Sequence, residues 1–299
     1  MLVHVVGAGA AGTALARALR SLPPADWTLG DVVSRSQERA EQRVALIGGG
    51  RPVGLPSWPD ASPDEPALLL LCVPDRHIGS LAADLASSPW PAGSVALHVS
   101  GSEAVDVLAP LREQGLATGS LHPLKSFVGP ADGDLTGVTC AVEGDPQALA
   151  LAEALAQAFG AHAFRLAPGG RAAWHAGAAH ACNHLVALVD QALDLMGRAG
   201  LDRDTARAAL LPLLAGTVEN LGQHPPGQAL TGPVVRGDAG VVARHVAALE
   251  EPGLSSDILS AYRALAGRAL HLARTQRDLD AELADRVEGA LDPDAPGPG

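Results

Sequence analysis

The first twelve residues of the chain decide its fold: Met1-Leu-Val-His-Val-Val-Gly7-Ala-Gly9-Ala-Ala-Gly12. The apolar run from Leu2 to Val6 predicts a strand, and the residues after Gly12 have helical spacing. Gly7 suits the tight turn, Gly9 leaves room for a pyrophosphate, and Gly12 lets the helix pack closely on the strand. Backbone N–H groups at the start of such a helix bind anionic oxygens. This GxGxxG therefore predicts a dinucleotide-binding site formed by Gly7, Ala8, Gly9, Ala10, Ala11 and Gly12.

Composition and charge narrow the class of protein. The 299 residues are 47% hydrophobic, enough for two domains, and the net charge of −12 disfavours nucleic acid and anionic membranes as partners. The apolar runs are broken by His and Asn, and a strand begins at once, so we expect neither a transmembrane span nor a signal peptide. Cys72, Cys140 and Cys182 form no CxxC pair, and we expect three buried, reduced thiols in a cytoplasmic protein.

Strands and helices alternate over the first half of the chain. The expected strands are apolar runs at 2–6, 28–33, 67–73, 94–99, 117–121, 138–142 and 161–166, while 52–66 is rich in turn residues. This alternation predicts a doubly wound parallel sheet of Rossmann type. From 167 onward the pattern is helical, with expected helices at 171–198, 205–221, 239–249, 255–273 and 275–291. We therefore predict an α/β fold with a NAD(P)-binding domain at 1–166, an all-helical domain at 167–291 and a flexible tail at 292–299.

The end of the second expected strand selects between the two nicotinamide dinucleotides. Asp31 lies at about the right distance from the glycines and would favour NAD, but Val32 and Val33 continue the strand beyond it. The turn that follows is Ser34-Arg35-Ser36, where a guanidinium between two hydroxyls suits a 2′-phosphate. The alternative is that Arg35 is only a solvated turn residue. We favour NADP, bound as NADPH.

Polar residues also follow the other expected strands, where ligands bind in open α/β sheets. Val73-Pro74-Asp75 should pass near the cofactor ribose, and Asp75 is the expected cap of a helix at 78–86. Ser100-Gly101 ends the next strand, beside the expected nicotinamide, and His122 follows the one after it. Lys125 is the single lysine of the chain, and lysine can transfer a proton where arginine cannot. We name Ser100, His122 and Lys125 as candidate catalytic residues, and Val73, Pro74, Asp75, Ser100 and Gly101 as cofactor contacts.

Two segments of the helical half carry further candidates. Asn183 is a polar amide in an otherwise apolar helix and needs a partner, and His175, two turns earlier, can border the same cleft. His180 and His184 have the i, i+4 spacing of metal ligands, but no Glu lies between them and no third ligand is evident, so we expect no metal. Leu230-Thr-Gly-Pro-Val-Val-Arg-Gly-Asp238 precedes a helix that its last residue can cap. We name His175 and Asn183 as catalytic candidates, and Thr231, Gly232 and Arg236 as contacts for an anionic substrate.

These segments together resemble the Rossmann-like proteins that carry a DUF2520 C-terminal domain. The resemblance spans nearly the whole chain. It rests on GAGAAG at 7–12, Ser34-Arg35-Ser36, CVPD at 72–75, HVSGS at 98–102, LHPLKSF at 121–127, the helix from Trp174-His175 to Asn183, and LTGPVVRGD at 230–238. That family is similar in architecture to pyrroline-5-carboxylate reductase, prephenate dehydrogenase and ketopantoate reductase, within the 6-phosphogluconate-dehydrogenase-like superfamily. The resemblance implies an all-helical second domain that covers the nicotinamide end of the cofactor and is often dimeric. We therefore expect a homodimer through this domain.

The resemblance also implies a substrate contact for Asn183. Many β-hydroxyacid dehydrogenases and ketopantoate reductases have a catalytic lysine four residues before this Asn, and here that position is Ala179. The proton donor is therefore open among His122, His175 and Lys125.

We expect an NADPH-dependent reductase that acts on a C=O or C=N bond of a small carboxylate-bearing metabolite, either a 2-oxo acid such as ketopantoate or a cyclic imine. The cofactor supplies the hydride, while protein groups orient the substrate and deliver a proton. Two alternatives are a non-catalytic NADP-binding sensor or scaffold, which the missing helix lysine favours, and an F420-dependent NADP reductase, which shares this N-terminal domain.

Overall fold

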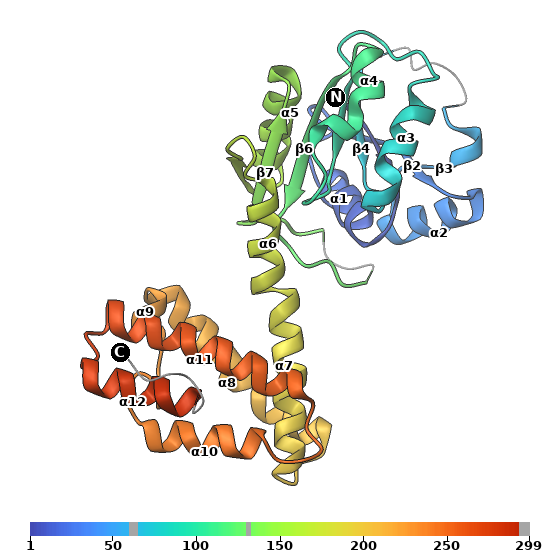
Figure 1. Cartoon of the computed structure of the whole chain (residues 1–299). Coiled ribbons are helices and arrows are strands. Elements are labelled where there is room, and N and C mark those ends of the chain that lie inside the picture. The colour runs from blue at the N-terminus through green and yellow to red at the C-terminus, as the bar shows by residue number, and fades with distance from the viewer. Residues whose placement is uncertain (60–64, 130–132, 293–299) are drawn as a thin grey trace. The chain divides into compact units, whose positions relative to one another are not determined.

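The computed structural model of the chain describes residues 1–59, 65–129 and 133–292. Its contacts divide the chain into two compact units, Met1–Asn183 and His184–Gly299. The described strands all lie in the first unit, and the second is built from helices (Figure 1). The predicted order, an α/β part followed by an all-helical part, is confirmed.

The first unit is built on one eight-stranded sheet with the order β3-β2-β1-β4-β5-β6-β7-β8. Its strands are β1 (Leu2–Val6), β2 (Thr28–Ser34), β3 (Arg51–Gly54), β4 (Ala67–Leu71), β5 (Val95–His98), β6 (Ala117–Pro123), β7 (Thr139–Gly144) and β8 (His162–Arg165). Neighbours from β3 to β6 are parallel. The chain runs outward from β1 to β3 and returns to β4 beside β1. Doubly wound sheets bind ligands at the carboxyl ends of the strands beside such a return.

The last two strands depart from the predicted all-parallel sheet. β7 pairs antiparallel with β6, with Gly119 opposite Gly144 and Pro123 opposite Cys140, and β8 pairs parallel with β7. A parallel neighbour needs a long crossover, usually a helix, and the described residues between β6 and β7 form no helix. β7 therefore returns directly beside β6 and runs in the opposite direction.

The short strand β3 lies in the segment that the sequence analysis assigned to turns. It contains Pro52, which cannot donate a hydrogen bond to a neighbouring strand. Proline is tolerated there because β3 is the edge strand of the sheet, next to β2.

Helices cover both faces of this sheet. In the described part of the first unit they are α1 (Ala10–Arg20), α2 (Gln37–Ile47), α3 (Ile78–Leu85), α4 (Ala109–Glu113), α5 (Pro146–Ala158) and α6 (Arg171–Ala181), with 3-10 turns at Leu55–Ser57, Asp75–His77 and Val105–Leu108. The predicted cap of α3 is wrong, because the helix begins after a 3-10 turn that Asp75 starts. The Asp75 carboxylate instead accepts a hydrogen bond of 2.6 Å from the Ser102 hydroxyl, and so ties the end of β4 to the loop after β5.

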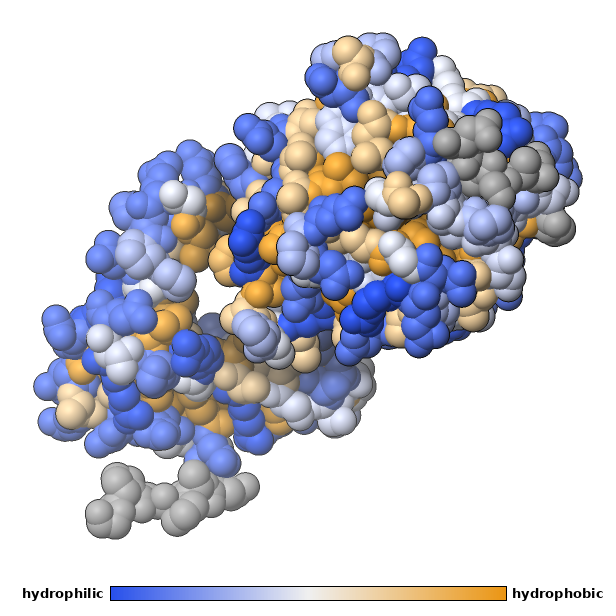
Figure 2. Space-filling model, turned by 90° about the horizontal axis from the view of Figure 1, so that it is seen from above, coloured by the Kyte–Doolittle hydropathy of each residue, from blue (hydrophilic) through white to orange (hydrophobic). Residues whose placement is uncertain are grey.

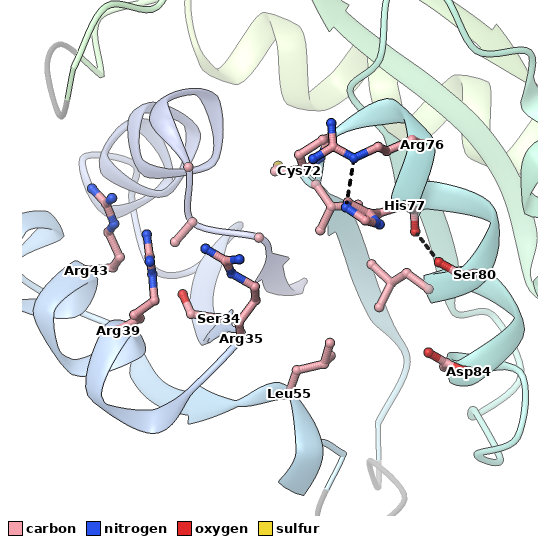
Figure 3. A pocket seen from close by; sticks show the side chains of 16 residues that line it. Ser34, Arg35, Arg39, Arg43, Leu55, Cys72, Arg76, His77, Ser80 and Asp84 are labelled. Atoms are coloured by element: carbon pink, nitrogen blue, oxygen red, sulfur yellow. Dashed lines mark hydrogen bonds between the residues drawn. The ribbon is translucent and has the colours of Figure 1, made fainter.

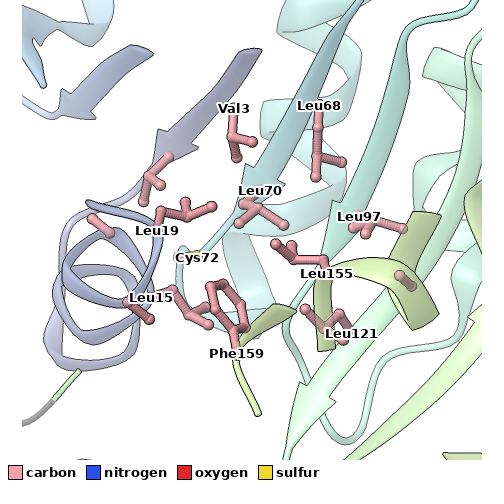
Figure 4. Packing of buried hydrophobic residues seen from close by; sticks show 14 of the residues in the cluster. Val3, Leu15, Leu19, Leu68, Leu70, Cys72, Leu97, Leu121, Leu155 and Phe159 are labelled. Atoms are coloured by element: carbon pink, nitrogen blue, oxygen red, sulfur yellow. The ribbon is translucent and has the colours of Figure 1, made fainter. Parts of the chain in front are cut away.

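Strand β4, with the sequence Ala-Leu-Leu-Leu-Leu, contributes to the cores on both faces of the sheet. Leu68 and Leu70 pack in the cluster beneath α1 and α5 (Figure 4), and Leu69 and Leu71 pack in the cluster beneath α3 and α4. All four leucine side chains are fully buried. An uninterrupted apolar run is typical of a strand covered on both faces, because successive side chains point to opposite faces. Each such leucine stabilises the fold by about 2 kcal/mol.

The second unit is all-helical. Its helices are α7 (Asn183–Arg198), α8 (Arg203–Gln223), α9 (Pro226–Ala229), α10 (Ala239–Leu249), α11 (Ser256–Gln276) and α12 (Ala281–Leu291). The carboxylates of Asp202, Asp238 and Asp280 accept hydrogen bonds from the first turns of α8, α10 and α12, which confirms the predicted cap at Asp238. Its main core lies among α10, α11 and α12, around Val242 and Leu270.

The predicted helix 171–198 is divided at Cys182, whose φ of −111° and ψ of −67° depart from helical values. The contacts divide the units after Asn183, whereas the predicted boundary falls between 166 and 167. The reason is that α6 is hydrogen-bonded to the sheet through Arg171. Except for Asp292, the predicted tail lies outside the described residues.

Two of the three cysteines are buried as predicted. Burial raises the pKa of the Cys72 thiol to about 12 and the pKa of the Cys140 thiol to about 11, so both stay protonated. Cys182 lies exposed where α6 ends, which corrects the prediction of a third buried thiol.

Among the described residues, no helix combines the length and the apolar character needed to cross a bilayer. On the face shown in Figure 2, hydrophilic side chains are interspersed with smaller groups of apolar ones on both units. Charged residues make up 18% of the chain, and they are spread along it rather than gathered in one run.

A buried carboxylate, Asp31, joins β2 to the edge of the sheet. Its oxygens accept hydrogen bonds from Arg51 Nε at 2.6 Å and from Trp58 Nε1 at 2.7 Å. His4 Nδ1 lies 3.0 Å from the backbone nitrogen of Asp31 and 3.1 Å from an oxygen of its carboxylate. Burial by itself raises the pKa of Asp31, but the hydrogen bonds to its carboxylate outweigh burial and hold the pKa well below the usual range.

We predict that Asp31→Asn lowers the free energy of unfolding by about 2 kcal/mol at pH 7, because it removes a charged acceptor from Arg51 and Trp58. The folded-state pKa is depressed, so the stabilisation is complete above the unfolded pKa of about 4 and is lost as the pH falls through the folded-state pKa. Urea titrations of the two proteins should therefore differ equally at pH 7 and pH 6, and less below about pH 4. Asp106→Asn, at an exposed pair with Arg112, is the control and should leave stability unchanged. A difference independent of pH would contradict the role of the charge.

Candidate functional site

The glycine turn between β1 and α1 has the form that the sequence predicts. Gly7 has a φ of +97°, and a Cβ on it would lie 2.8 Å from the backbone of Cys72. A Cβ on Gly12 would lie 2.1 Å from the carbonyl oxygen of Gly7, so strand and helix pack too closely for a side chain. At Gly9 a Cβ would meet nothing within 4 Å. Gly7 and Gly12 are therefore tightly enclosed by the surrounding backbone, while Gly9 faces open space.

The start of α1 is suited to an anion. Gly9 is its N-cap residue, no described side chain accepts from its first N–H groups, and its first turn has no acidic residue. Ala10, Ala11 and Gly12 lie in that first turn, where backbone N–H groups have no acceptor within the helix. The partial positive charge of a helix start favours a phosphate there.

A cavity of about 480 Å³ lies beside this helix start (Figure 3). It brings together residues that follow β1, β2 and β4 at their carboxyl ends. The predicted cofactor contacts among its lining residues are Gly7, Ala8, Gly9, Ser34, Arg35, Val73 and Pro74. Ser36 has another role, since its hydroxyl accepts from the backbone N–H of Arg39 and caps α2.

Four arginines give this cavity its charge. Arg35 precedes α2 and Arg39 and Arg43 follow at intervals of four residues within it, while Arg76 lies opposite them, in the turn after β4 (Figure 3). Asp84 is the one acidic side chain among the described lining residues. Positive charge concentrated in a chain of net charge −12 suits a ligand with several phosphates. Arg35 was predicted from the sequence, whereas Arg39, Arg43 and Arg76 were not, although the four-residue spacing of Arg39 and Arg43 after Arg35 was a readable signal.

Asp31, the alternative ribose ligand, is buried and bonded to Arg51 and Trp58. It is not among the described lining residues of the cavity. The end of β2 presents Ser34 and Arg35 there instead, which favours a 2′-phosphate over a 2′-hydroxyl.

A second cavity, of about 670 Å³, lies where the end of β6 meets α6. It brings four of the predicted catalytic residues together: His122 and Lys125 from the end of β6, and His175 and Asn183 from α6 and the residues after it. Small residues of α6, among them Ala178, line it between these groups. Because β1 to β6 are parallel, both cavities lie at the carboxyl edge of the sheet.

The fifth predicted catalytic residue, Ser100, is placed differently. Its buried hydroxyl accepts hydrogen bonds from the backbone N–H groups of Ser102 at 3.1 Å and Glu103 at 3.0 Å, which shape the loop after β5. It is not among the described lining residues of either cavity. Neighbouring Gly101 lies against two imidazoles, because a Cβ on it would lie 2.7 Å from His122 Nε2 and 2.7 Å from His175 Cδ2. Catalysis by Ser100 and cofactor contacts of both residues stay predictions.

The two imidazoles lie edge to face. The ring centroids of His122 and His175 are 6.2 Å apart. Burial, reinforced by His175 and Arg171, lowers the pKa of His122 to about 4, so this ring is neutral at pH 7. Trp174 Nε1 donates a hydrogen bond of 3.1 Å to His122 Nδ1, and Phe164 of β8 stacks on the indole. No role was predicted for Trp174 or Phe164 from the sequence, because their partners are distant in the chain.

Arg171, the first residue of α6, ties this helix to the sheet. Its Nη1 donates to the carbonyl oxygen of Ser100 at 2.9 Å, and its Nε donates to the Glu143 carboxylate of β7 at 2.7 Å. Its Nη2 donates to the same carboxylate and to the Ser120 hydroxyl of β6. The Arg171 side chain is 7% exposed, so these bonds form away from water and are strong. They hold His175, one helical turn further along, over the end of β6.

The remaining titratable candidates have other partners. Lys125 Nζ donates to the backbone carbonyl oxygen of Asp134 at 2.5 Å. His180 lies in α6 and His184 in α7. Within residues 1–59, 65–129 and 133–292, no group of three His, Cys, Asp or Glu side chains is placed to hold a metal ion.

The predicted substrate contacts Thr231, Gly232 and Arg236 lie in the second unit, in the connection between α9 and α10. Gly232 has a φ of +107°, which glycine adopts without strain. Contact of these residues with an anionic substrate stays a prediction.

Two family models match the chain. A Rossmann-like domain matches residues 1–123, and a domain of unknown function, DUF2520, matches residues 138–269. No curated protein matches the sequence.

Solved structures share this fold over nearly the whole chain. The protein TM1727 from Thermotoga maritima is 24% identical, with a TM-score of 0.71 over 93% of this chain and 100% of that one. A reductive aminase from Aspergillus terreus, in complex with NADPH and ethyl-5-oxohexanoate, is 19% identical, with a TM-score of 0.62 over 93% and 99%. A 1-pyrroline-5-carboxylate reductase from Streptococcus pyogenes is 14% identical, with a TM-score of 0.61 over 90% and 98%. At these identities the likeness is one of fold.

We predict that Arg171→Gln lowers the free energy of unfolding by about 3–5 kcal/mol, because it leaves the Glu143 carboxylate without its buried cation. Arg165→Gln is the control, since Arg165 also donates to a glutamate, Glu153, through Nε and Nη2 but does so at the surface, and it should change stability little. Chemical denaturation monitored by circular dichroism measures both effects. Equal stability of the two variants would show that α6 does not depend on the buried pair.

Proposed function

We propose that this chain, which joins a Rossmann-like domain to a DUF2520 domain, is an NADPH-dependent oxidoreductase that reduces a C=O or C=N bond of a small carboxylate-bearing metabolite. One observation carries the proposal: the cavity with four arginines is continuous with the glycine turn at the start of α1. Open space at Gly9, an uncapped helix start and nearby guanidinium groups fit a dinucleotide with an extra phosphate.

The residues divide by role along the sheet edge. Backbone N–H groups at the start of α1 bind the pyrophosphate, and Arg35 with Arg39, Arg43 and Arg76 binds the 2′-phosphate. When bound, NADPH supplies a hydride to the substrate carbon. The reacting oxygen or nitrogen of the substrate also takes up a proton, so that C=O becomes an alcohol or C=N an amine.

The second cavity is the proposed substrate site. It lies at the same edge of the sheet and is lined by His122, His175, Lys125 and Asn183. We assign the proton donor to His175 rather than His122, because the pKa of His122 is lowered to about 4 by burial and its ring holds no extra proton at neutral pH. Asn183 then orients the substrate through its amide.

The known activities of proteins with this fold support a reductase. The Aspergillus terreus structure is a reductive aminase in complex with NADPH, and the Streptococcus pyogenes structure is a 1-pyrroline-5-carboxylate reductase. We also place the protein in the cytoplasm, because the three cysteines are free thiols, as is typical of a reducing compartment.

We predict that Arg35→Asp raises the Kd for NADPH at least about tenfold and leaves the Kd for NADH nearly unchanged, because NADH has no 2′-phosphate for this residue to bind. Arg286→Asp makes the same charge change in the second unit and should alter neither constant. Isothermal titration calorimetry measures all four affinities. Equal weakening of both nucleotides would remove the assignment to NADP.

Oxidation of NADPH across a panel of small 2-oxo acids and cyclic imines tests the reductase itself. Turnover that His175→Ala reduces at unchanged NADPH affinity supports the assigned proton donor. Stoichiometric NADPH binding without turnover of any member would favour the non-catalytic sensor or scaffold. Absence of binding to either nucleotide would overturn the proposed function.

We infer that the protein is a homodimer through its helical unit. Large apolar side chains of α7 and α8 are 39–68% exposed: Leu185, Val186, Leu188, Leu211, Leu213, Val218 and Leu221. Helices with this much exposed apolar surface are usually covered by a partner.

We predict that wild-type protein elutes with twice the chain mass of 30.3 kDa in light-scattering chromatography. Val186→Asp, which introduces a charge on α7, should shift it to the monomer. Val128→Asp makes the same change at an exposed position of the first unit and should leave the dimer intact. A monomeric wild type would overturn the inference.

A further inference from the structure

The hydrogen bond between Trp174 and His122 determines where the imidazole proton lies. An indole N–H can donate but cannot accept, and Trp174 Nε1 lies 3.1 Å from His122 Nδ1. His122 Nδ1 must therefore accept, which leaves the ring proton on Nε2. The indole is held in place by Phe164, whose ring stacks on it with a centroid distance of 5.7 Å and an angle of 15° between the planes.

The groups around His122 keep it neutral. Arg171 and His175 from α6 oppose its protonation, and Asp75 from the turn after β4 favours it. His98 of β5 is buried beside it, and burial lowers the pKa of His98 to about 4, so it adds no charge at pH 7. Burial is the largest effect on His122 and lowers its pKa to about 4. The ring is therefore a neutral Nε2–H donor throughout the physiological range.

The Nε2–H group of His122 is available to a ligand. His122 lines the second cavity, and its Nε2 has no hydrogen-bond partner among the described residues. This nitrogen lies against Gly101, where a Cβ would come within 2.7 Å of it. A glycine is needed at this position, because the rings of His122 and His175 occupy the space that a Cβ would fill.

We propose that Trp174 is a positioning residue that fixes His122 as an Nε2–H donor, and that the substrate presents a carbonyl oxygen to this donor. This inference rests on the proposed function and decides between its two substrate classes. A ketone oxygen has lone pairs that accept from Nε2–H, and the bond strengthens as negative charge develops on the oxygen during reduction. A protonated imine has an N–H and no free lone pair, so a fixed donor opposes it. The substrate is therefore a 2-oxo acid rather than a cyclic imine.

Nitrogen-15 NMR of histidine-labelled protein tests the positioning role without any substrate. In the wild type, the signals that disappear in His122→Gln should show a protonated Nε2 and an unprotonated Nδ1. Trp174→Phe keeps an aromatic ring against Phe164 but loses the donor, so the two tautomers should mix and the pKa of His122 should rise by about one unit. Trp90→Phe is the matched control, because Trp90 Nε1 donates to the Leu85 carbonyl oxygen instead, and it should leave these signals unchanged. A wild-type ring protonated on Nδ1 would overturn the inference.

Turnover tests the substrate class with two compounds of similar size, 2-oxobutanoate and 1-pyrroline-2-carboxylate. We expect NADPH oxidation with the 2-oxo acid, and an approximately tenfold loss of kcat/KM in Trp174→Phe at unchanged Kd for NADPH. Preference for the cyclic imine, or turnover of neither compound, would overturn the substrate assignment. Failure of NADPH to bind would instead contradict the proposed function, and the NMR result on His122 would stand.

Discussion

The arrangement of the candidate site depends on one buried ion pair, between Arg171 and Glu143. The guanidinium lies at the start of α6 and is bonded to β6, β7 and the loop after β5. A cation in this position needs every one of those acceptors, because an unpaired buried charge costs several kcal/mol. These hydrogen bonds therefore hold the start of α6 against the sheet. The position of α6 in turn determines where the rings of Trp174 and His175 lie.

The sheet places the residues of both cavities along one edge. Parallel strands bring their carboxyl ends together, so the glycine turn after β1 and the arginines after β2 lie beside the loops after β4, β5 and β6. The residues proposed to bind phosphate lie at the β1 and β2 end, and the imidazoles lie at the β6 end. The reversal of β7 gives β6 an antiparallel neighbour, from which Glu143 reaches Arg171.

Electrostatics distinguishes the two cavities. The first concentrates guanidinium groups in a chain of net charge −12, an arrangement that suits a polyanionic ligand. In the second, burial and a neighbouring cation keep His122 neutral and give it a fixed direction of donation. In the proposed function, the charged cavity binds the cofactor, and His122, a neutral donor of fixed tautomer, contacts the substrate.

The sequence by itself determined the Rossmann-type order, the glycine turn, most of the helices and the position of Arg35, because each depends on local periodicity or on the special geometry of glycine. The sequence also indicated His122, His175 and Asn183, since a polar side chain in an apolar segment needs a hydrogen-bond partner. The tertiary structure alone decided the reversal of β7, the roles of Arg171 and Trp174, and the tautomer of His122. The partners in those bonds come from separate strands and helices. A local sequence pattern cannot predict these contacts, because the residues become neighbours only when the folded sheet brings the ends of the strands together.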